Sequence, residues 1–434
     1  MKKRKFSLFS FCFLFFFLAA STTASLAIPV EAAADAIVSP ALYVLAADSD
    51  MAMAGLRGNS IRIESEDFAR ALNLSTVKEI TVTQIPPTTD GELRVGTTVV
   101  NNGQTLGAQS LSLLSYTASS DVTTSSFRFR VGNTPYEITC QLYLLDEVNH
   151  APTLSAVPKN TLNVSTHRNI TLYGTLPCYD PDGDVTTIEI VSYPERGILV
   201  LTDRHSGDYT FTPGENYAGK DSFTYVARDM YGNYSAAATV SLTVTKPTSN
   251  LVYHDIVGQP CYNAALTMAE EGIMGGTQVG TSTYFYPDRE VSRAEFCMMA
   301  MNAIGITEPA PATSTVFSDD AAIPDAAKNY IATAYELGYV KGLYRDDTLC
   351  FEPNRAITRA EAAVMIGNMI GVSTPTIAPT FADADAIPTW ASASLSSLTS
   401  MGILDTESGN VAPMSAVTRA DAAEMLYEVM RSVN

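Results

Sequence analysis

Hydrophobic positions change their spacing twice along the 434-residue chain. A continuous apolar run fills residues 6–20, and short stretches of alternating or β-branched residues with turn residues between them follow over residues 38–246. From about residue 251 onward, apolar residues recur at three- and four-residue intervals, which is typical of amphipathic helices. The pattern predicts a short apolar leader, a β-rich middle and an α-helical C-terminal part.

Three of the expected helices begin with the same motif. Residues 291–296 (VSRAEF), 357–362 (ITRAEA) and 417–422 (VTRADA) place a hydroxyl residue, Arg, Ala and an acid ahead of an apolar stripe. In such a capping box the hydroxyl oxygen accepts from the backbone N–H three residues on, and the acid reaches back to the N–H of the cap. The predicted cap pairs are Ser292 with Glu295, Thr358 with Glu361, and Thr418 with Asp421.

Capping does not explain the arginine in each motif. Arg293, Arg359 and Arg419 occupy the first helical position, where the helix dipole mildly disfavours a cation. An arginine beside free N–H groups forms a compact anion site. The sequence therefore predicts a receptor for a repetitive anionic ligand, with arginines that serve binding more than stability.

The residues around these motifs recur in register. An earlier helix ends in glycine at Gly276 and Gly342, Phe-x-Pro follows at residues 285–287 and 351–353, and an aspartate precedes each first helix, at Asp255, Asp319 and Asp383. Arg359 follows Arg293 by 66 residues, and Arg419 follows Arg359 by 60. This order resembles the S-layer homology module, repeated three times over roughly residues 251–434.

The resemblance implies a helical three-module pseudo-trimer that binds pyruvylated secondary cell-wall polysaccharide attached to peptidoglycan. It also implies that the arginines and aspartates contact the polymer, together with Gly276, Gly342 and Trp390. The third copy keeps the family tryptophan as Trp390 but has Asp405 where the others have the second glycine, and Val411-Ala-Pro for Phe-x-Pro. Which of the three grooves is competent is therefore left open.

Residues 1–27 are interpreted as a secretory signal peptide, since a basic start precedes an apolar run shorter than the ~20 residues that span a bilayer. An uncleaved membrane anchor is the alternative. Removing the leader's four cations would change the net charge from −19 to −23. A chain this acidic has no basic face for phosphates, which excludes nucleic-acid partners, and after cleavage no other stretch could cross a membrane.

The β-rich middle is clearest over residues 151–245, where roughly seven short strands are predicted, as a β-sandwich requires. Among them are residues 188–192, 198–201 and 238–244. The DPDGD turn at 180–184 and the GKDSFTY strand at 219–225 resemble the bacterial immunoglobulin/cadherin-like repeat of surface adhesins. A weaker copy precedes it, with residues 91–95, 114–117 and 126–131 in corresponding positions.

Asp180, Asp182 and Asp184 could supply hard oxygen ligands to Ca²⁺, and the cadherin-like resemblance suggests Asp229 nearby. The alternative is a Pro-Asp-Gly turn that needs no metal, which the absence of an EF-hand's closing Glu favours. No other cofactor is expected. Five cysteines remain outside the apolar run, without CxxC spacing, so neither a disulfide framework nor a zinc site is indicated.

The sequence contains no Gly-x-Ser-x-Gly, His-Glu-x-x-His or Walker motif, and an enzyme is not expected. The expected fold is multidomain, with two all-β Ig/cadherin-like sandwiches followed by the helical pseudo-trimer. The expected divisions are a signal peptide at 1–27, sandwiches at 38–149 and 150–246, and S-layer homology modules at 251–306, 315–372 and 379–434.

The expected function is non-covalent anchoring of a secreted protein to the bacterial cell wall, with the sandwiches displayed for adhesion or for binding an unknown ligand. A structural S-layer lattice subunit is the alternative, and a wall-associated glycan hydrolase is the weaker one.

Overall fold

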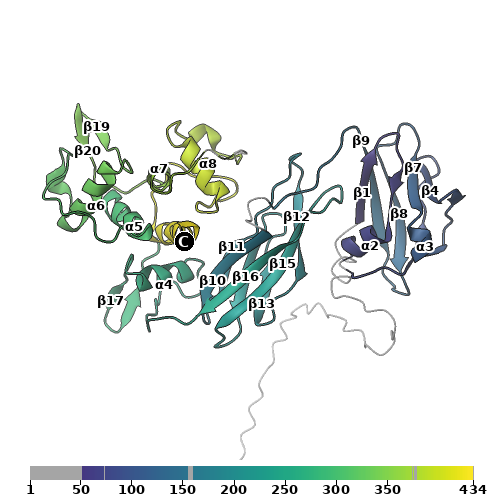
Figure 1. The fold of residues 1–434 in the computed structure, drawn as a ribbon, viewed down its shortest axis with the longest axis horizontal. Helices are drawn as coiled ribbons and strands as arrows, with labels where there is room; N and C mark the ends of the chain where they lie inside the picture. Colours follow the sequence, from purple (N-terminus) through teal and green to yellow (C-terminus); the bar gives the residue numbers. More distant parts are fainter. Residues whose placement is uncertain (1–50, 73, 155–159, 374, 376–378, 434) are drawn as a thin grey trace, which may run out of the picture.

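A computed structural model of the protein describes residues 51–433 apart from 73, 155–159, 374 and 376–378. Figure 1 shows two groups of β-strands followed by a helical group, arranged in a row. They are called here the first β region (residues 51–145), the second β region (161–245) and the helical region (251–433). The signal-peptide interpretation concerns residues 1–27, which lie outside the described part of the chain.

The first β region contains two sheets around one core. One sheet has the order β1-β9-β8-β3-β6, with β1 and β9 parallel, and the other has the order β2-β7-β4-β5. The helix α2 contributes Phe68, whose ring meets Phe129 edge-on at 5.0 Å between the centroids. The expectation of a purely β region did not include α2 and α3. The elements are β1 (Met51–Leu56), β2 (Ile61–Arg62), α2 (Ser65–Ala71), β3 (Glu79–Gln84), β4 (Gly91–Val95), β5 (Thr98–Val99), β6 (Thr105–Gly107), α3 (Ala108–Leu111), β7 (Leu114–Ala118), β8 (Thr124–Val131) and β9 (Ile138–Leu145).

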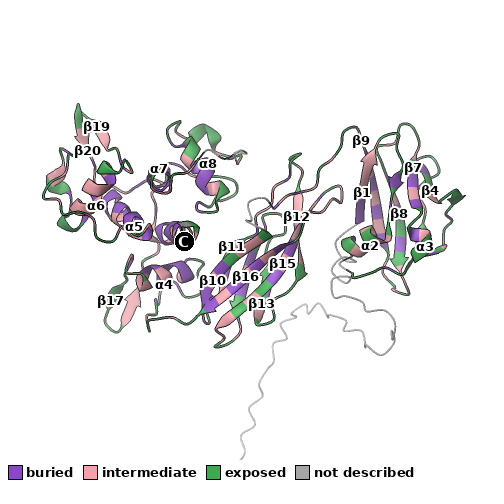
Figure 2. Ribbon diagram, in the orientation of Figure 1, coloured by how far each residue is buried: buried purple, intermediate pink, exposed green. Residues whose placement is uncertain are grey.

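The second β region also contains two sheets that enclose a core. Along β16 every other residue is buried, so the alternation in the sequence gives one face to the core. Figure 2 shows this face as buried stretches on β15 and β16. The four-stranded sheet has the order β10-β16-β15-β12, and the three-stranded sheet β11-β14-β13. The strands are β10 (Thr161–His167), β11 (Leu172–Thr175), β12 (Thr186–Ser192), β13 (Gly197–Leu201), β14 (Asp208–Pro213), β15 (Gly219–Asp229) and β16 (Ala238–Thr245).

The helical region repeats one pattern, in which a first helix, a loop or hairpin and a second helix follow one another. A single hydrophobic cluster runs from Tyr253 to Val429 and joins all three copies. The elements are α4 (Tyr262–Glu270), β17 (Thr277–Val279), β18 (Ser282–Tyr284), α5 (Arg293–Ala303), η3 (Asp320–Ala322), α6 (Asp325–Glu336), β19 (Leu343–Arg345), β20 (Thr348–Cys350), α7 (Arg359–Ile370), η4 (Ala384–Ala386), α8 (Ser392–Ser400) and α9 (Arg419–Val433).

The three copies are called modules 1 to 3, and each packs its second helix on a helix of a neighbouring module. The second helix of each module packs on the first helix of the next, so α5 packs on α6, α7 on α8 and α9 on α4. Backbone hydrogen bonds close the same cycle. The N–H of Val291 donates to Val417 at 2.9 Å, that of Val417 to Ile357 at 2.9 Å, and that of Ile357 to Val291 at 3.0 Å. The three second helices therefore start from one hydrogen-bonded ring.

The second β region contacts the helical region directly, at α4 and α9. His167, at the end of β10, is 6% exposed and lies with its Nε2 atom 3.1 Å from a carboxylate oxygen of Glu270 in α4. The Asn263 side chain in α4 accepts from the His167 backbone N–H at 3.1 Å. The Tyr427 hydroxyl in α9 donates to the Ser165 carbonyl at 2.9 Å. The joint thus uses α4 and α9, the helices of modules 1 and 3.

Candidate functional site

The capping motifs form the start of each second helix. The Ser292 hydroxyl accepts from the N–H of Glu295 at 3.3 Å, and the Glu295 carboxylate accepts from the N–H of Ser292 at 3.0 Å. Thr358 with Glu361 has the same two bonds, as has Thr418 with Asp421. The cap fixes the direction of the following side chain, which is the arginine of the motif.

Each arginine reaches into the loop of the next module. The Nε atom of Arg293 donates to the carbonyl of Phe351 at 2.9 Å, that of Arg359 to Val411 at 2.8 Å, and that of Arg419 to Phe285 at 2.7 Å. These contacts define three junctions. The first junction joins modules 1 and 2 through Arg293, the second joins modules 2 and 3 through Arg359, and the third joins modules 3 and 1 through Arg419.

The arginines thus have a structural role that the sequence did not predict. Arg293 is 5% exposed, and its guanidinium lies 5.1 Å from the centre of the Phe351 ring and 3.4 Å from the Glu361 carboxylate. Burial lowers the pKa of Arg293, and Glu361 opposes that shift. The hydrogen bond and ion pair of Arg293 hold two modules together, a contribution to stability that the sequence did not indicate, while a role of Arg293 in binding polymer stays a prediction.

Arg359 and Arg419 are less buried and also reach the surface. The Nη2 atom of Arg419 donates at an exposed position to the Gly275 carbonyl at 2.6 Å, and that of Arg359 to Asp405 at 2.5 Å. The arginines of the second and third junctions are therefore partly accessible to solvent, whereas the first junction encloses its arginine.

Each of the three aspartates holds one loop of its own module, which is Phe-x-Pro in modules 1 and 2 and Val411-Ala-Pro in module 3. Asp255 accepts from the N–H groups of Phe285 and Tyr286, Asp319 from those of Phe351 and Glu352, and Asp383 from those of Val411 and Ala412. The second residue of each loop has a positive φ, namely +57° at Tyr286, +58° at Glu352 and +48° at Ala412. Non-glycine residues rarely adopt this conformation, so the two charge-assisted hydrogen bonds offset its cost. The aspartates act here as loop organisers.

Gly276 and Gly342 allow close packing between the hairpin and the aromatic residue before the first helix. A Cβ on Gly276 would lie 2.4 Å from Tyr253 Cε1, and one on Gly342 would lie 2.6 Å from Phe317 Cε1. Gly342 also has a φ of +73°. Trp390 is 58% exposed, and it is the preceding residue, Thr389, that lines a depression of about 570 Å³ in module 3. The depression is lined by Pro379, Thr380, Phe381, Ala384, Ile387, Thr389, Ser392 and Ser396.

Module 3 also holds an acidic group that the sequence did not identify. Burial raises the pKa of Glu424 in α9 to about 7, and the nearby Asp405 and Asp421 raise it further. Burial likewise raises the pKa values of Asp405 and Glu428. Asp421, Glu424 and Glu428 follow one another at three- and four-residue spacing on α9, whereas Asp405 comes from the loop before it. The helical spacing of the three acids was a signal in the sequence, but the approach of Asp405 was not.

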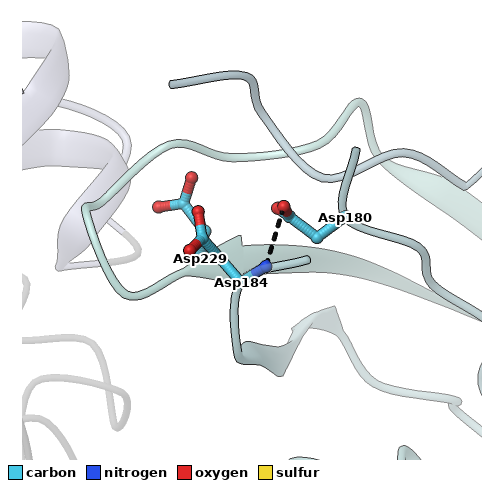
Figure 3. A group of neighbouring side chains, drawn as sticks. All are labelled: Asp180, Asp184 and Asp229. Atoms are coloured by element: carbon cyan, nitrogen blue, oxygen red, sulfur yellow. Dashed lines mark hydrogen bonds between the residues drawn. The ribbon is translucent and has the colours of Figure 1, made fainter. Parts of the chain in front are cut away.

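A separate carboxylate cluster lies in the second β region. One oxygen from each of Asp180, Asp184 and Asp229 lies within 4.8 Å of the others. Figure 3 shows the three side chains converging, with the Asp184 backbone N–H donating to Asp180. Asp182, predicted with them, points instead to His150, whose backbone N–H and Nδ1 lie 2.6 Å and 3.0 Å from its carboxylate oxygens. The prediction of Asp182 as a ligand is therefore wrong.

Two oxygens of this cluster fit a cation. Asp180 is 5% exposed, and Oδ2 of both Asp180 and Asp184 is buried without a hydrogen-bond partner among the described residues. Burial and the neighbouring carboxylates raise the pKa of Asp184. Asn149 donates to Asp229 at 2.7 Å and links the cluster to the chain entering the region. Hard oxygen ligands of this kind suit Ca²⁺.

Comparisons with known families agree with this architecture. The S-layer homology domain model matches residues 252–297, 316–363 and 380–423, and the bacterial cadherin-like domain model matches residues 149–246. The chain is therefore a surface protein that carries three S-layer homology domains behind a bacterial cadherin-like domain. It is a secreted cell-surface protein, and in the part of the chain that the structure describes no helix is long and apolar enough to cross a membrane.

Curated relatives match only in part. The cellulosome-anchoring protein of Acetivibrio thermocellus is 32% identical over 24% of this chain and 22% of its own length. The surface-layer 125 kDa protein of Lysinibacillus sphaericus is 24% identical over 48% of this chain and 17% of its own length. Exoglucanase XynX of Acetivibrio thermocellus is 28% identical over 43% of this chain and 17% of its own length. The chain thus spans less than a quarter of each of these relatives.

Among solved structures, an endo-fucoidan hydrolase of glycoside hydrolase family 107 covers 38% of this chain at 22% identity with a TM-score of 0.20. That score is too low to relate the two folds.

Proposed function

We propose that the helical region anchors the protein non-covalently to the cell wall by binding pyruvylated secondary cell-wall polysaccharide. The observation that carries the proposal is the recurrence of an arginine at each of three junctions, of which Arg359 and Arg419 are only partly buried. Guanidinium groups bind carboxylates through charge-assisted hydrogen bonds. A pyruvyl ketal carries one carboxylate per modified sugar, so a repetitive polymer can meet several junctions at once.

In the same proposal the β regions are two sandwiches of immunoglobulin or cadherin-like type, displayed outward for adhesion or for binding a further ligand. The three modules form a pseudo-trimer, which the cyclic packing of α5 on α6, α7 on α8 and α9 on α4 supports. The S-layer homology domains and the relatives support cell-wall anchoring of a surface protein. The particular polymer and the ligand of the β regions are parts of the proposal. A lattice-forming S-layer subunit is the alternative.

The test is sedimentation of the secreted protein with isolated wall sacculi, before and after chemical removal of the secondary polymer. We expect the protein to pellet with intact sacculi and to stay in solution with stripped ones. Equal binding to intact and to stripped sacculi would contradict the proposal that the secondary polymer is the ligand. Assembly of the free protein into ordered sheets would favour the lattice alternative.

A second proposal concerns calcium. Oδ2 of Asp180 and Oδ2 of Asp184 are buried and have no hydrogen-bond partner in the described part of the chain. With Asp229 beside them, they support a site that takes Ca²⁺ and stabilises the second β region. A bound cation would neutralise carboxylates that otherwise repel one another. We expect Ca²⁺ to raise the melting temperature of the protein. Asp184→Asn should abolish that rise and Asp182→Ala should keep it, because the Asp182 carboxylate is bound to His150. An equal response from both variants would place the effect elsewhere.

A further inference from the structure

The joint between the second β region and α4 encloses a histidine whose two ring nitrogens both face oxygen atoms. Nδ1 of His167 lies 2.9 Å from Oδ1 of Asn263, and Nε2 lies 3.1 Å from Oε2 of Glu270. The side chains of His167 and Glu270 are only 8% and 11% exposed. A neutral imidazole has one N–H donor and one acceptor nitrogen, whereas the imidazolium cation donates from both nitrogens. The protonation state of this ring therefore depends on whether both neighbouring oxygens can only accept.

The hydrogen bonds of Asn263 fix which end of its amide faces the ring. Its Oδ1 also accepts from the backbone N–H of His167 at 3.1 Å, and its Nδ2 donates to the carbonyl of Ser165 at 3.2 Å. A rotated amide would turn its NH2 group toward that N–H and lose both bonds. The atom beside Nδ1 is therefore an oxygen acceptor, and Nδ1 carries a hydrogen.

Glu270 presents an ionised carboxylate to the other ring nitrogen. Its Oε1 accepts from the backbone N–H groups of Thr248 at 2.6 Å and Ser249 at 3.2 Å. Burial alone would raise the pKa of Glu270, but these bonds and the one with His167 outweigh burial and hold the pKa below its ordinary value. Oε2 of the ionised group can only accept, so Nε2 carries a hydrogen as well. With both nitrogens protonated, His167 is a buried cation paired with Glu270.

The other charged groups near the joint do not replace this pair. Among the ion pairs of the described residues, that of His167 with Glu270 is the one that crosses the joint. On α9, Glu428 and Arg431 pair with each other at 2.6 Å, and Arg431 also donates to the carbonyl of Asn163. The remaining charged side chains on the segments that meet at the joint are the half-buried Arg168 and the exposed Lys246 and Glu271. Solvent and salt screen these charges, so the protonation of His167 decides whether the joint has its ion pair.

We propose that this joint is a proton-controlled latch, which holds the second β region on α4 while His167 is doubly protonated and releases it when the ring loses a proton. A ring with one N–H turns a nitrogen lone pair toward either Oδ1 of Asn263 or the Glu270 carboxylate, and burying such an unmatched contact is costly. Residues 246–250 are then the link about which the displayed β regions turn relative to the anchor. The latch does not depend on which polymer the anchor binds.

The direction of the pH dependence follows from proton linkage. The docked joint holds a proton that an ordinary imidazole releases above a pH of about 6.5. Docking is therefore strongest below this pH and weakens as the pH rises, until the docked ring also loses its proton. For one proton, the docking equilibrium constant should fall up to about tenfold per pH unit in this range.

The first test measures the protonation of the ring in the full chain, labelled with nitrogen-15 in its histidines. At about pH 7, above the range in which an ordinary imidazole is mostly charged, both ring nitrogens of His167 should have the NMR chemical shifts of protonated nitrogen. The signals are assigned by their absence from the His167→Gln variant. Shifts of a neutral tautomer at this pH would overturn the proposal.

The second test measures docking by small-angle X-ray scattering of the full chain from about pH 5.5 to about pH 9, on both sides of the ordinary imidazole range. The largest dimension of the wild type should increase with pH, while circular dichroism shows that the regions stay folded. His167→Gln has no titrating ring. Glu270→Gln supplies an NH2 group that can donate to an unprotonated Nε2. Both variants should therefore lose the change of dimension with pH.

The matched control is His205→Gln, which removes an exposed histidine of the same β region and should keep the wild-type response to pH. A response that is lost in His167→Gln and Glu270→Gln but kept in His205→Gln is the supporting result. A wild type whose dimensions stay constant over the whole pH range would overturn the latch, as would a His167→Gln variant that still responds as the wild type does.

Discussion

In the second β region every sheet partner of a strand lies within residues 161–245, whereas in the helical region α5, α7 and α9 pack on first helices of other modules. The β region therefore completes its core with its own residues, such as Phe211, Phe223 and Tyr225. A single S-layer homology module has no such core, because the cluster from Tyr253 to Val429 is shared by all three. A repeat that is distinct in the sequence is thus not a unit that completes its own core in this structure.

The largest effect on stability should come from deleting one of the three modules, because their helices pack in a closed cycle. Removing residues 374–434 takes away α8 and α9, and so leaves α7 and α4 without the helices they pack on. We expect modules 1 and 2 to lose cooperative unfolding, as judged by circular dichroism during heating. The matched change is removal of residues 1–149, which should leave the melting of the helical region in place. Cooperative unfolding of modules 1 and 2 in the absence of module 3 would contradict the conclusion that the three modules fold as one unit.

A smaller effect should follow from Arg293→Ala in the first junction. The change removes a buried hydrogen bond to Phe351, but Glu361 keeps a second partner, since Arg355 lies 2.6 Å away. We expect a loss of roughly 1.5–3 kcal/mol in the free energy of unfolding, the value of a charge-assisted hydrogen bond. Denaturant titration measures it, with Arg345→Ala, an exposed ion pair of module 2, as the control. A comparable loss of unfolding free energy in both variants would mean that the buried contacts of Arg293 stabilise the protein no more than an exposed ion pair does.

Phe223→Ala offers the corresponding test in the second β region. Phe223 is fully buried among residues of its own region, and such truncations cost about 3–5 kcal/mol locally. The helical region should keep its own unfolding transition in this variant. If both regions lose stability together, the contrast drawn between them fails.

Removing the N-cap of α7 should lower the free energy of unfolding by about 0.5–2 kcal/mol. Thr358→Ala removes the acceptor for the N–H of Glu361 while leaving Arg359 in place. The melting temperature of the helical region should fall and wall binding should change little. Thr358→Ser keeps the hydroxyl and should restore most of the stability; its failure to do so would assign the effect to the threonine methyl group.

The smallest expected effect is a dependence of the folding stability on pH above 5. The folded-state pKa of Glu424, about 7, exceeds the ordinary value of 4.5, so the folded protein binds more protons than the unfolded chain between these values. Stability should therefore decrease as pH rises from 5 to 8. The partial exposure of this group, together with the opposing effect of Arg359, limits the size of the change. Melting temperatures of wild type and Glu424→Gln should converge at pH 5 and separate at pH 8, with wild type lower.

Much of the local structure could be predicted from sequence. The strands over residues 188–192 and 238–244 correspond to β12 and β16 within two residues. The capping pairs also followed from sequence, because a capping box is encoded within four residues. The repeats indicated three equivalent arginines in the same way.

What could not be predicted depends on contacts between distant residues. Arg293 meets Phe351, and Arg419 meets Phe285, 134 residues earlier in the chain. No periodicity encodes which module an arginine will enter, so the sequence alone predicts a first-turn cation that is free to bind a ligand. Asp182 shows the same limit, since its partner His150 lies 32 residues away and removes it from a cluster that its spacing suggested.

The joint formed by His167, Asn263, Glu270, Ser165 and Tyr427 has a mechanical consequence. It ties the end of β10 to α4 and to α9, which are the two helices that pack together across the third junction. A load applied to the displayed β regions, as by flow or by a tethered neighbour, would therefore be divided between modules 1 and 3. Both sides of the third junction would be pulled together, so that tension is carried through the ring as a whole and does not peel away one module at a time.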